Sequence, residues 1–360
     1  MPGVPAGEVF LHIGLMKTGT SYLQVRLRSA LDELEKQGVT LVPRKQFDAH
    51  RLAVVVLDAF DPEVAKARDA AALERLPRQL EEATVGRALI SAETLSDATA
   101  EQIARLAGAL GDRRVHVVLT VRDIGRSLPS LWQQAVRAGQ TVGFLEYLDG
   151  IVAGPRGGHV FWRAHEVLAV LERWGALAPP ERCHVVAVPP AGAPREQLLE
   201  RFCSVLGVDA RLLPPPPELA VNQVNESLGL VQTEVLRRVN GLLPEESLRV
   251  DVRRRTIRKP FTFGVLAAQP GTPIRVPHRY ADWCRDHTSR VLTQLERSGH
   301  QVVGSPSDLM PADDSFADSD PEVDPEEVAE SAVQALAALL GQRVEEFVEA
   351  KAARRRQAEK

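Results

Sequence analysis

One apolar stretch limits the fold of this chain more than any other feature. Residues Val115–Val121 read VHVVLTV, a pattern typical of a strand buried on both faces of a sheet. Similar segments alternate along the chain with segments of helical periodicity, which predicts an α/β fold with a central parallel β-sheet flanked by helices. The predicted strands are Glu8–Ile13, Arg87–Ser91, Val115–Val121 and His184–Val188. The predicted helices are 23–34, Ala100–Leu110, Leu128–Ala138, Arg163–Trp174, Glu196–Leu206, Asn225–Asn240 and Tyr280–Ser298.

The loop between the first predicted strand and the first predicted helix has the features of an anion site. The segment His12–Gln24 reads HIGLMKTGTSYLQ. A helix N-terminus offers unpaired backbone N–H groups and the positive end of the helix dipole. Gly14 and Gly19 allow a tight turn and a close approach of the backbone to a ligand. Three residues add hydroxyl donors: Thr18, Thr20 and Ser21. We therefore predict that this loop binds a phosphate-like group.

The lysine of this loop is displaced from the position that ATP-hydrolysing proteins use. Gly14 and Gly19 match the glycine spacing of the nucleotide-binding pattern GxxxxGK[ST]. Thr20 and Ser21 stand where that pattern has a lysine and a metal-binding hydroxyl, and the lysine of this chain is Lys17, inside the loop. The pair that holds Mg²⁺ is therefore missing at its usual place. The loop suits an anion whose transfer does not need a metal.

A second anion-binding segment follows the strand Val115–Val121. In an open parallel sheet, ligands bind beyond the carboxyl ends of the strands, and Arg122 follows such an end. Pro129 suits the first turn of the next helix, which would place Ser130 near the N-terminus of that helix. A guanidinium, a hydroxyl and free N–H groups together suit a second phosphate. The alternative is that Arg122 pairs with Asp123 or with a neighbouring loop.

The composition narrows the class of protein. The 360 residues are enough for a large core, and 44% of them are hydrophobic, as in an ordinary globular protein. The nearly balanced charge of −4 gives no sign of a nucleic-acid partner. Cys183, Cys203 and Cys284 are too scattered for a metal or redox motif and favour a reducing compartment. We find neither a signal peptide nor an apolar run of about 18 residues that could span a membrane, so we expect a cytoplasmic protein.

The chain changes character near its C-terminus. We predict an α/β domain over residues 1–310, an acidic linker containing Pro and Ser over 311–327, and an amphipathic helix over 328–360. Apolar residues recur at every fourth position of this helix: Val328, Ala332, Leu336, Leu340, Val344 and Val348. We expect the stripe to pack on the body of the protein or on a second copy, which would make a homo-oligomer.

The two anion segments resemble those of sulfotransferases that use 3′-phosphoadenosine 5′-phosphosulfate. HIGLMKTGTSYLQ resembles their 5′-phosphosulfate loop, and LTVRDIGRSLPSLW, residues 119–132, resembles their 3′-phosphate segment. Between them, ALISAETLSD, residues 88–97, resembles the strand and loop that carry an acidic base in carbohydrate-type members. These motifs cover roughly residues 8–138, and later stretches resemble bacterial members more loosely. The resemblance implies a sulfotransferase with the P-loop-like fold of that family.

The resemblance also implies roles for individual residues. A sulfuryl group would move in line from the donor to an acceptor oxygen or nitrogen without a metal. Lys17 would stabilise charge on the bridging oxygen, and Arg122 with Ser130 would hold the 3′-phosphate. The 5′-phosphate would bind the backbone N–H groups of Thr18, Gly19, Thr20 and Ser21.

The base of such a reaction is predicted to be Glu93. A carboxylate can take a hydroxyl proton if it lies within hydrogen-bond reach. The alternatives for Glu93 are a surface side chain or a helix cap, and His159 or His165 could then line the acceptor side. We interpret His12 and His116 as strand residues that pack beside the site or in the core.

The acceptor is the least constrained part of this prediction. The resemblance suggests a hydroxyl or amine of a carbohydrate, glycolipid or secondary metabolite, with walls at 141–162 and 222–263. Two other functions remain open: a nucleotide-dependent small-molecule kinase on a related fold, and a catalytically degenerate nucleotide-binding protein.

Overall fold

The computed structural model describes residues 7–59, 71–83, 86–157, 159–215 and 228–358. It divides into two compact units, each assembled from separate stretches of the chain. Unit 1 comprises Met1–Ser127, Gly150–Val224 and Arg279–Asp313. Unit 2 comprises Leu128–Asp149, Asn225–His278 and Asp314–Lys360.

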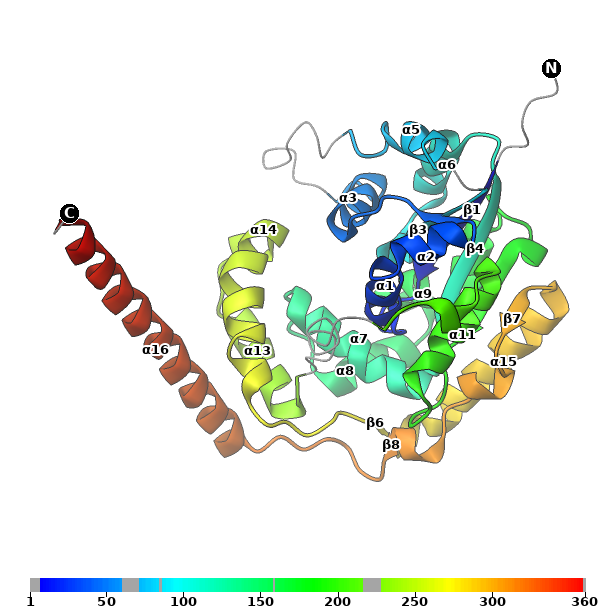
Figure 1. Cartoon of the computed structure of the whole chain (residues 1–360). Coiled ribbons are helices and arrows are strands. Elements are labelled where there is room, and N and C mark those ends of the chain that lie inside the picture. The colour runs from blue at the N-terminus through cyan, green and yellow to red at the C-terminus, as the bar shows by residue number, and fades with distance from the viewer. Residues whose placement is uncertain (1–6, 60–70, 84–85, 158, 216–227, 359–360) are drawn as a thin grey trace, which may run out of the picture. The chain divides into compact units, whose positions relative to one another are not determined.

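A six-stranded parallel sheet forms the centre of unit 1 (Figure 1). Its strands, in spatial order, are β2 (Val39–Leu41), β3 (Arg87–Ser91), β1 (Glu8–Gly14), β4 (Arg114–Val121), β5 (Cys183–Ala187) and β7 (Gln301–Val303). Every neighbouring pair is parallel, which confirms the predicted α/β class. The two edge strands were not predicted, because three residues are too few to show a period.

Helices cover both faces of this sheet. Successive side chains of a strand point to opposite faces, so strands that are apolar throughout need cover on both sides. Val9, Leu11 and Ile13 of β1 pack into one core, whereas Phe10 belongs to the other. The first core also takes side chains from α3 (Gln46–Val56), α5 (Leu76–Glu81), α6 (Ala100–Leu110), α10 (Val167–Trp174) and α15 (Ala281–Ser298). The second takes side chains from α1 (Thr20–Arg28), α2 (Leu31–Lys36) and α11 (Arg195–Leu206).

Two of the predicted helices are each divided into two in the structure. The helix expected over 23–34 breaks between α1 and α2, where the Ser29 hydroxyl donates to the carbonyls of Val25 at 3.0 Å and Arg26 at 2.9 Å. The helix expected at Arg163–Trp174 is α9 (Val160–Ala164) followed by α10. Glu166 separates them, because its carboxylate accepts the Ala169 N–H at 2.6 Å and caps α10.

Unit 2 is mostly helical. α7 (Ile124–Ala138) runs into it from unit 1, and Arg253 donates to the Arg137 carbonyl at its C-terminal end at 2.6 Å. The same guanidinium donates to Asn240 Oδ1 at 2.6 Å, which ties α7 to α13. The other elements are α8 (Phe144–Val152, which ends in unit 1), α13 (Leu230–Asn240), α14 (Val250–Arg253), the π-helix η6 (Arg254–Phe263) and the strands β6 (Val276–Pro277) and β8 (Phe316–Ala317). Residues 225–227 of the predicted helix Asn225–Asn240 lie outside the described residues.

The predicted C-terminal helix is confirmed as α16 (Pro325–Ala358), which is continuous (Figure 1). It contacts α13 and η6. The preceding segment, expected to be a solvated linker, contains β8 with the buried side chain of Phe316. The division into domains at 310 and 327 stays a prediction. Among the described residues, no helix is both long and apolar enough to cross a membrane.

Candidate active site

Three of the predicted site residues, Lys17, Glu93 and Arg122, follow the carboxyl ends of neighbouring strands in unit 1. β3, β1 and β4 are adjacent, and all three are parallel. Glu93 follows the carboxyl end of β3, Lys17 lies in the loop after β1, and Arg122 directly follows β4. Adjacent strands are about 4.8 Å apart. The carboxyl ends of the strands are where an open parallel sheet offers a ligand site.

The loop after β1 ends at an uncapped helix N-terminus. Gly19 occupies the N-cap position of α1 with φ 83°, and no side chain caps the helix. The first N–H groups of α1 therefore remain available to an anion. A Cβ at Gly19 would lie 2.6 Å from Leu198 Cδ2, so both the backbone angle and the packing require glycine.

Thr18 differs from the prediction in what its side chain does. Its hydroxyl donates to the Leu15 carbonyl at 2.5 Å and lies 2.7 Å from Thr120 Oγ1. The residue is only 1% exposed, so this hydroxyl anchors the loop to β4 and is not directed at a ligand. Thr20 is also buried, whereas Ser21 is exposed.

His12 lies beneath the loop as a structural residue, as predicted. Its Nδ1 is 2.8 Å from Ser91 Oγ, and its Nε2 is 3.3 Å from Thr120 Oγ1. Complete burial lowers the pKa of His12 to about 3, so the ring is neutral at physiological pH. His12 therefore links β1 to the strands on either side. His116 in β4 stacks on Phe10 at 4.5 Å between ring centroids.

Glu93 lies directly against the loop. It begins the short 3-10 helix η1 (Glu93–Asp97), and a Cβ on Gly14 would come within 2.8 Å of the Glu93 carbonyl oxygen. Gly14 has φ 100°, so this close approach needs glycine. The carboxylate accepts a hydrogen bond from Gln24 Nε2 at 2.8 Å. The loop of Lys17 and the predicted base are thus held side by side.

Gln24 contacts the predicted base, and the sequence did not reveal this contact. It lies on α1 and is 4% exposed. Its Nε2 also donates to Ser91 Oγ at 3.2 Å, and its Oε1 accepts from Gln46 Nε2 at 2.8 Å. The amide therefore has a fixed orientation, with its donor directed at Glu93. The only signal in the sequence is a polar residue one turn after Thr20, on the face where Leu23 and Leu27 are buried.

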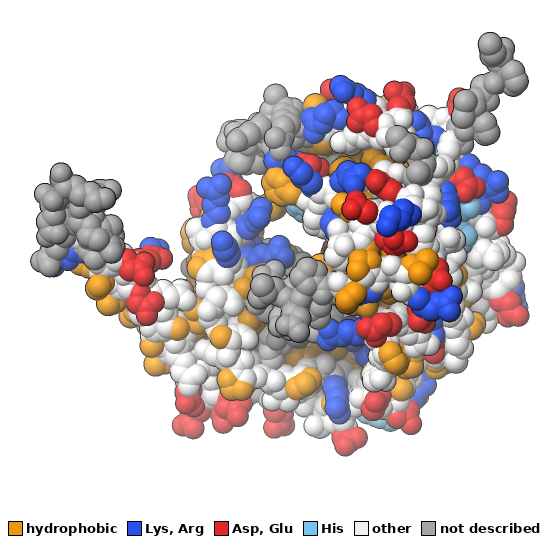
Figure 2. Space-filling model, in the orientation of Figure 1, with side chains coloured by type: hydrophobic (Ala, Val, Ile, Leu, Met, Phe, Trp, Pro, Cys, Tyr) orange, Lys and Arg blue, Asp and Glu red, His pale blue; other side chains and the backbone are white. Residues whose placement is uncertain are grey.

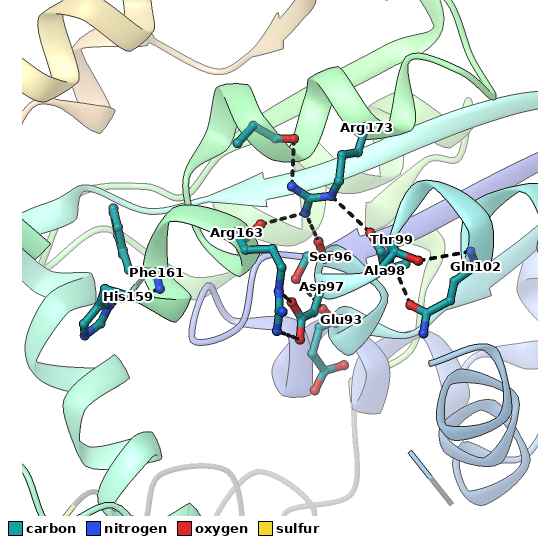
Figure 3. Close-up of polar contacts among 11 residues, drawn as sticks. Glu93, Ser96, Asp97, Ala98, Thr99, Gln102, His159, Phe161, Arg163 and Arg173 are labelled. Atoms are coloured by element: carbon teal, nitrogen blue, oxygen red, sulfur yellow. Dashed lines mark hydrogen bonds and ion pairs between the residues drawn. The ribbon is translucent and has the colours of Figure 1, made fainter. Parts of the chain in front are cut away.

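Two arginines fix the other end of η1 (Figure 3). Arg163 donates to both carboxylate oxygens of Asp97, at 2.6 and 3.1 Å. Arg173 donates to the carbonyls of Ser96 at 2.8 Å and Ala98 at 3.0 Å. The segment that carries Glu93 is therefore anchored at both ends, which favours a fixed carboxylate position.

Arg28 adds a positive charge near this carboxylate. It lies one turn beyond Gln24 on α1, and Glu93 acts on it electrostatically. Burial lowers the pKa of Arg28 to about 10, and the Glu93 carboxylate opposes this shift. The guanidinium therefore stays cationic at neutral pH.

Arg122 keeps its charge at the end of β4. Burial and the nearby Arg126 lower its pKa to about 10, and Asp123 opposes the shift. The Asp123 carboxylate accepts the Arg126 backbone N–H at 2.9 Å and also pairs with the Arg126 guanidinium. Asp123 therefore caps the start of α7 and is bonded to Arg126, and its charge also acts on Arg122.

The expected position of Ser130 near a helix N-terminus was wrong. α7 begins at Ile124, because Asp123 supplies its cap, so Pro129 lies inside the helix and Ser130 is its seventh residue. Arg122 belongs to unit 1 and Ser130 to unit 2. A joint role of Arg122 and Ser130 therefore stays a prediction.

The two alternative bases lie on or beside α9. His159 Nδ1 accepts the Phe161 N–H at 3.1 Å and caps this helix, and burial lowers the pKa of His159. Burial lowers the pKa of His165 to about 4. Both rings are neutral at physiological pH, and His159 has a structural role. A role of either histidine as the base stays a prediction.

A hollow of about 280 Å³ opens beside the N-terminus of α3. Its described lining residues are Pro43, Lys45, Asp48, Leu52, Ala72, Arg75 and Gln79. Among these described residues, Lys45 and Arg75 are cationic and Asp48 is acidic, and Asp48 pairs with Arg51 at 3.0 Å. Of the predicted acceptor walls, residues 158 and 222–227 lie outside the described residues.

Three solved structures of sulfotransferases are similar to this chain. A sulfotransferase from Alicyclobacillus acidocaldarius has 16% identity and a TM-score of 0.37, over 70% of this chain and 96% of its own. The sulfotransferase domain from the curacin biosynthetic pathway has 13% identity and a TM-score of 0.34, over 83% and 99%. That of the Synechococcus PCC 7002 olefin synthase has 12% identity and a TM-score of 0.33, over 71% and 94%. No family model and no curated protein matches the sequence.

Proposed function

We propose that this chain is a sulfotransferase that transfers a sulfuryl group from 3′-phosphoadenosine 5′-phosphosulfate to a hydroxyl or amine acceptor. One observation carries the proposal. The Lys17 loop, with the uncapped N-terminus of α1, lies against Glu93, whose carboxylate is held by Gln24 at 2.8 Å. A positive anion cradle beside a fixed carboxylate suits the transfer of an anionic group to an acceptor that must lose a proton.

The residues at the carboxyl ends of β1 and β4 have the groups needed to bind this donor. Gly14 and Gly19 adopt positive φ angles that let the loop turn tightly into the N-terminus of α1. The N–H groups of Thr18, Gly19, Thr20 and Ser21 would hold the 5′-phosphate at the positive end of α1. Arg122 supplies a cation for the 3′-phosphate, and we assign Ser130 to the same group. In this donor the sulfuryl group is joined to the 5′-phosphate, which is the leaving group of the transfer.

Each polar side chain then has a distinct role. Glu93 would take up the proton that the acceptor loses as its oxygen or nitrogen bonds to sulfur. Lys17 would stabilise the negative charge left on the bridging oxygen when the sulfur–oxygen bond breaks. Gln24 would keep the carboxylate of Glu93 directed at the acceptor.

The proposed acceptor is a carbohydrate, glycolipid or secondary metabolite, and the proposed location is the cytoplasm. We propose that the hollow beside α3 holds part of this acceptor. Lys45, which lines the hollow, precedes Gln46, whose side chain is hydrogen-bonded to Gln24, and Gln24 is bonded to Glu93. Lys45 and Arg75 would favour a polar acceptor, or one that carries an acidic group.

A kinase has less support from this geometry. A Mg²⁺-dependent enzyme needs a free carboxylate near the phosphates. Asp123 is the carboxylate after β4, and both of its oxygens are bonded to Arg126. A degenerate nucleotide-binding protein would have no need of the fixed Glu93.

The test is a transfer assay with labelled donor against panels of sugar, lipid and phenol acceptors. We expect label transfer to at least one acceptor class. We also expect thermal stabilisation by adenosine 3′,5′-bisphosphate that exceeds stabilisation by ATP with Mg²⁺. Stabilisation by ATP with Mg²⁺ alone, together with phosphate transfer, would establish the kinase instead. Bisphosphate binding without transfer to any acceptor would favour the degenerate binding protein.

A further inference from the structure

α16 carries an exposed apolar stripe that the proposed reaction does not use. This exposed stripe differs from the set of every fourth residue expected from the sequence, because Val328 of that set is buried. Six large apolar side chains along it are between 57% and 70% exposed: Val333, Leu336, Leu340, Val344, Phe347 and Val348. Figure 2 shows hydrophobic side chains along the surface of this helix. Contiguous apolar surface of this kind marks an interaction site.

The face of α16 that packs within unit 2 is a different one. Val328, Ser331 and Ala335 are buried. Ser331 donates to Gln269 Oε1 at 2.5 Å, and its carbonyl accepts from Gln269 Nε2 at 3.1 Å. At about 100° per residue, these side chains point away from the stripe that contains Leu340. The contacts within unit 2 therefore leave the stripe uncovered.

The spacing of the stripe is that of a helix-pairing surface. From Val333 to Phe347 the apolar positions are three, four, four and three residues apart, which averages the 3.5-residue repeat of coiled coils. The pattern is also symmetric about Leu340: Leu336 and Val344 lie four residues away on either side, and Val333 and Phe347 lie seven away. A second α16 in the opposite direction would present the same pattern to the first.

The charges of α16 favour that opposite direction. Its first turns carry Glu326, Glu327 and Glu330, whereas the sequence of its last turns has one acidic residue, Glu349, against Lys351 and the run Arg354–Arg356. With Leu340 of the two copies opposed, the acidic end of each helix meets the basic end of the other. A parallel pair would oppose like charges at both ends, which is unfavourable.

We propose that the stripe binds the same stripe of a second copy, so that two α16 helices pair antiparallel with Leu340 at the two-fold axis. The interface is isologous and therefore closes at a dimer. The proposal does not depend on the sulfotransferase activity.

The first experiment measures mass by light scattering on size-exclusion chromatography, with the full chain at micromolar concentration. We expect twice the chain mass of 39.4 kDa. Leu340→Glu places two carboxylates at the axis and should give the mass of one chain. Leu212→Glu is the matched control, because Leu212 is also 57% exposed but lies in unit 1, and it should stay dimeric. Circular dichroism checks that both variants are folded.

Two results of this experiment would overturn the proposal: a monomeric wild-type chain, or a Leu340→Glu variant that remains a dimer. A monomeric chain that binds phospholipid vesicles through α16 would identify a membrane surface as the partner in its place.

The second experiment tests the direction by disulfide cross-linking. The native cysteines Cys183, Cys203 and Cys284 are buried, so an introduced surface cysteine reacts alone. Leu340→Cys should form a disulfide-linked dimer under mild oxidation, because the two side chains meet at the axis. Val333→Cys should not, because its antiparallel neighbour is Phe347. Equal cross-linking of both variants would indicate a parallel pair and refute the antiparallel arrangement.

Discussion

Replacing Glu93 with Gln removes a base and leaves the site geometry in place. The amide has nearly the same size as the carboxylate, and its oxygen can accept the hydrogen bond that Gln24 donates at 2.8 Å. The backbone of Glu93 stays against Gly14, and Arg163 and Arg173 still anchor the far end of η1. Donor binding should therefore hardly change, while proton removal from the acceptor is lost.

The expected size of the effect follows from general-base catalysis. A positioned base contributes roughly 10²- to 10⁴-fold to a rate. At about 1.36 kcal/mol for each factor of ten, this is about 2.7–5.4 kcal/mol of activation free energy. Because the hydrogen bond from Gln24 survives in Glu93→Gln, the loss should reflect basicity, and kcat should fall at least about a hundredfold.

The assay follows label transfer from the sulfuryl donor to the best acceptor of the panel. Calorimetry with adenosine 3′,5′-bisphosphate reports donor-site affinity separately. Glu101→Gln, an exposed position on α6, is the control and should leave both values unchanged. An unchanged kcat for Glu93→Gln would refute the assignment and move the role to His159 or His165. A comparable loss of bisphosphate affinity would mean that Glu93 supports the loop.

Four further outcomes are expected. Lys17→Ala should abolish most turnover without lowering the melting temperature, because it leaves no core cavity; near-normal kcat would exclude the loop as the reaction centre. Arg122→Ala should weaken the binding of adenosine 3′,5′-bisphosphate by about 1.5–3 kcal/mol, since charge-assisted hydrogen bonds have this strength, and calorimetry should find the binding of AMP unchanged. An equal loss of affinity for both ligands would contradict a 3′-phosphate role. Gln24→Met should lower kcat about tenfold at constant bisphosphate affinity, and an unaltered kcat would show that Glu93 needs no positioning. The pKa of His12 is 6.5 in the unfolded chain and about 3 in the folded one, so acidification between these values should reduce the free energy of unfolding, by up to about 1.4 kcal/mol per pH unit. In urea unfolding, His12→Asn should show a shallower pH dependence of this free energy. An identical slope would be inconsistent with a neutral buried His12.

Much of the fold could be predicted because its central strands are apolar on both sides. Arg87–Ser91 and Ala100–Leu110 have the predicted bounds, and β4 begins one residue earlier than expected. The edge strand Val39–Leu41 gave no signal, since its role depends on pairing with β3 from another part of the chain. Lys17, Glu93 and Arg122 were expected together because the carboxyl ends of adjacent parallel strands lie on the same side of a sheet. This expectation does not depend on how the side chains pack.

The rest of the site depends on packing that a local pattern does not contain. Gln24 meets Glu93 across 69 residues of sequence, so its role depends on how α1 lies on the sheet. The Thr18 hydroxyl points into the protein because it hydrogen-bonds with Thr120 in β4, which is distant in sequence. The start of α7 was misjudged because Pro129 was taken as a first-turn proline, although Asp123 already provided a cap.

The interleaved segments of the two units have a consequence for how the protein is made. β7, the last strand of the large sheet, lies at residues 301–303, and α16 lies at 325–358. A ribosome adds residues from the N-terminus onward, so neither unit can complete its packing before these late segments have been made. No cut at a single position yields either unit whole.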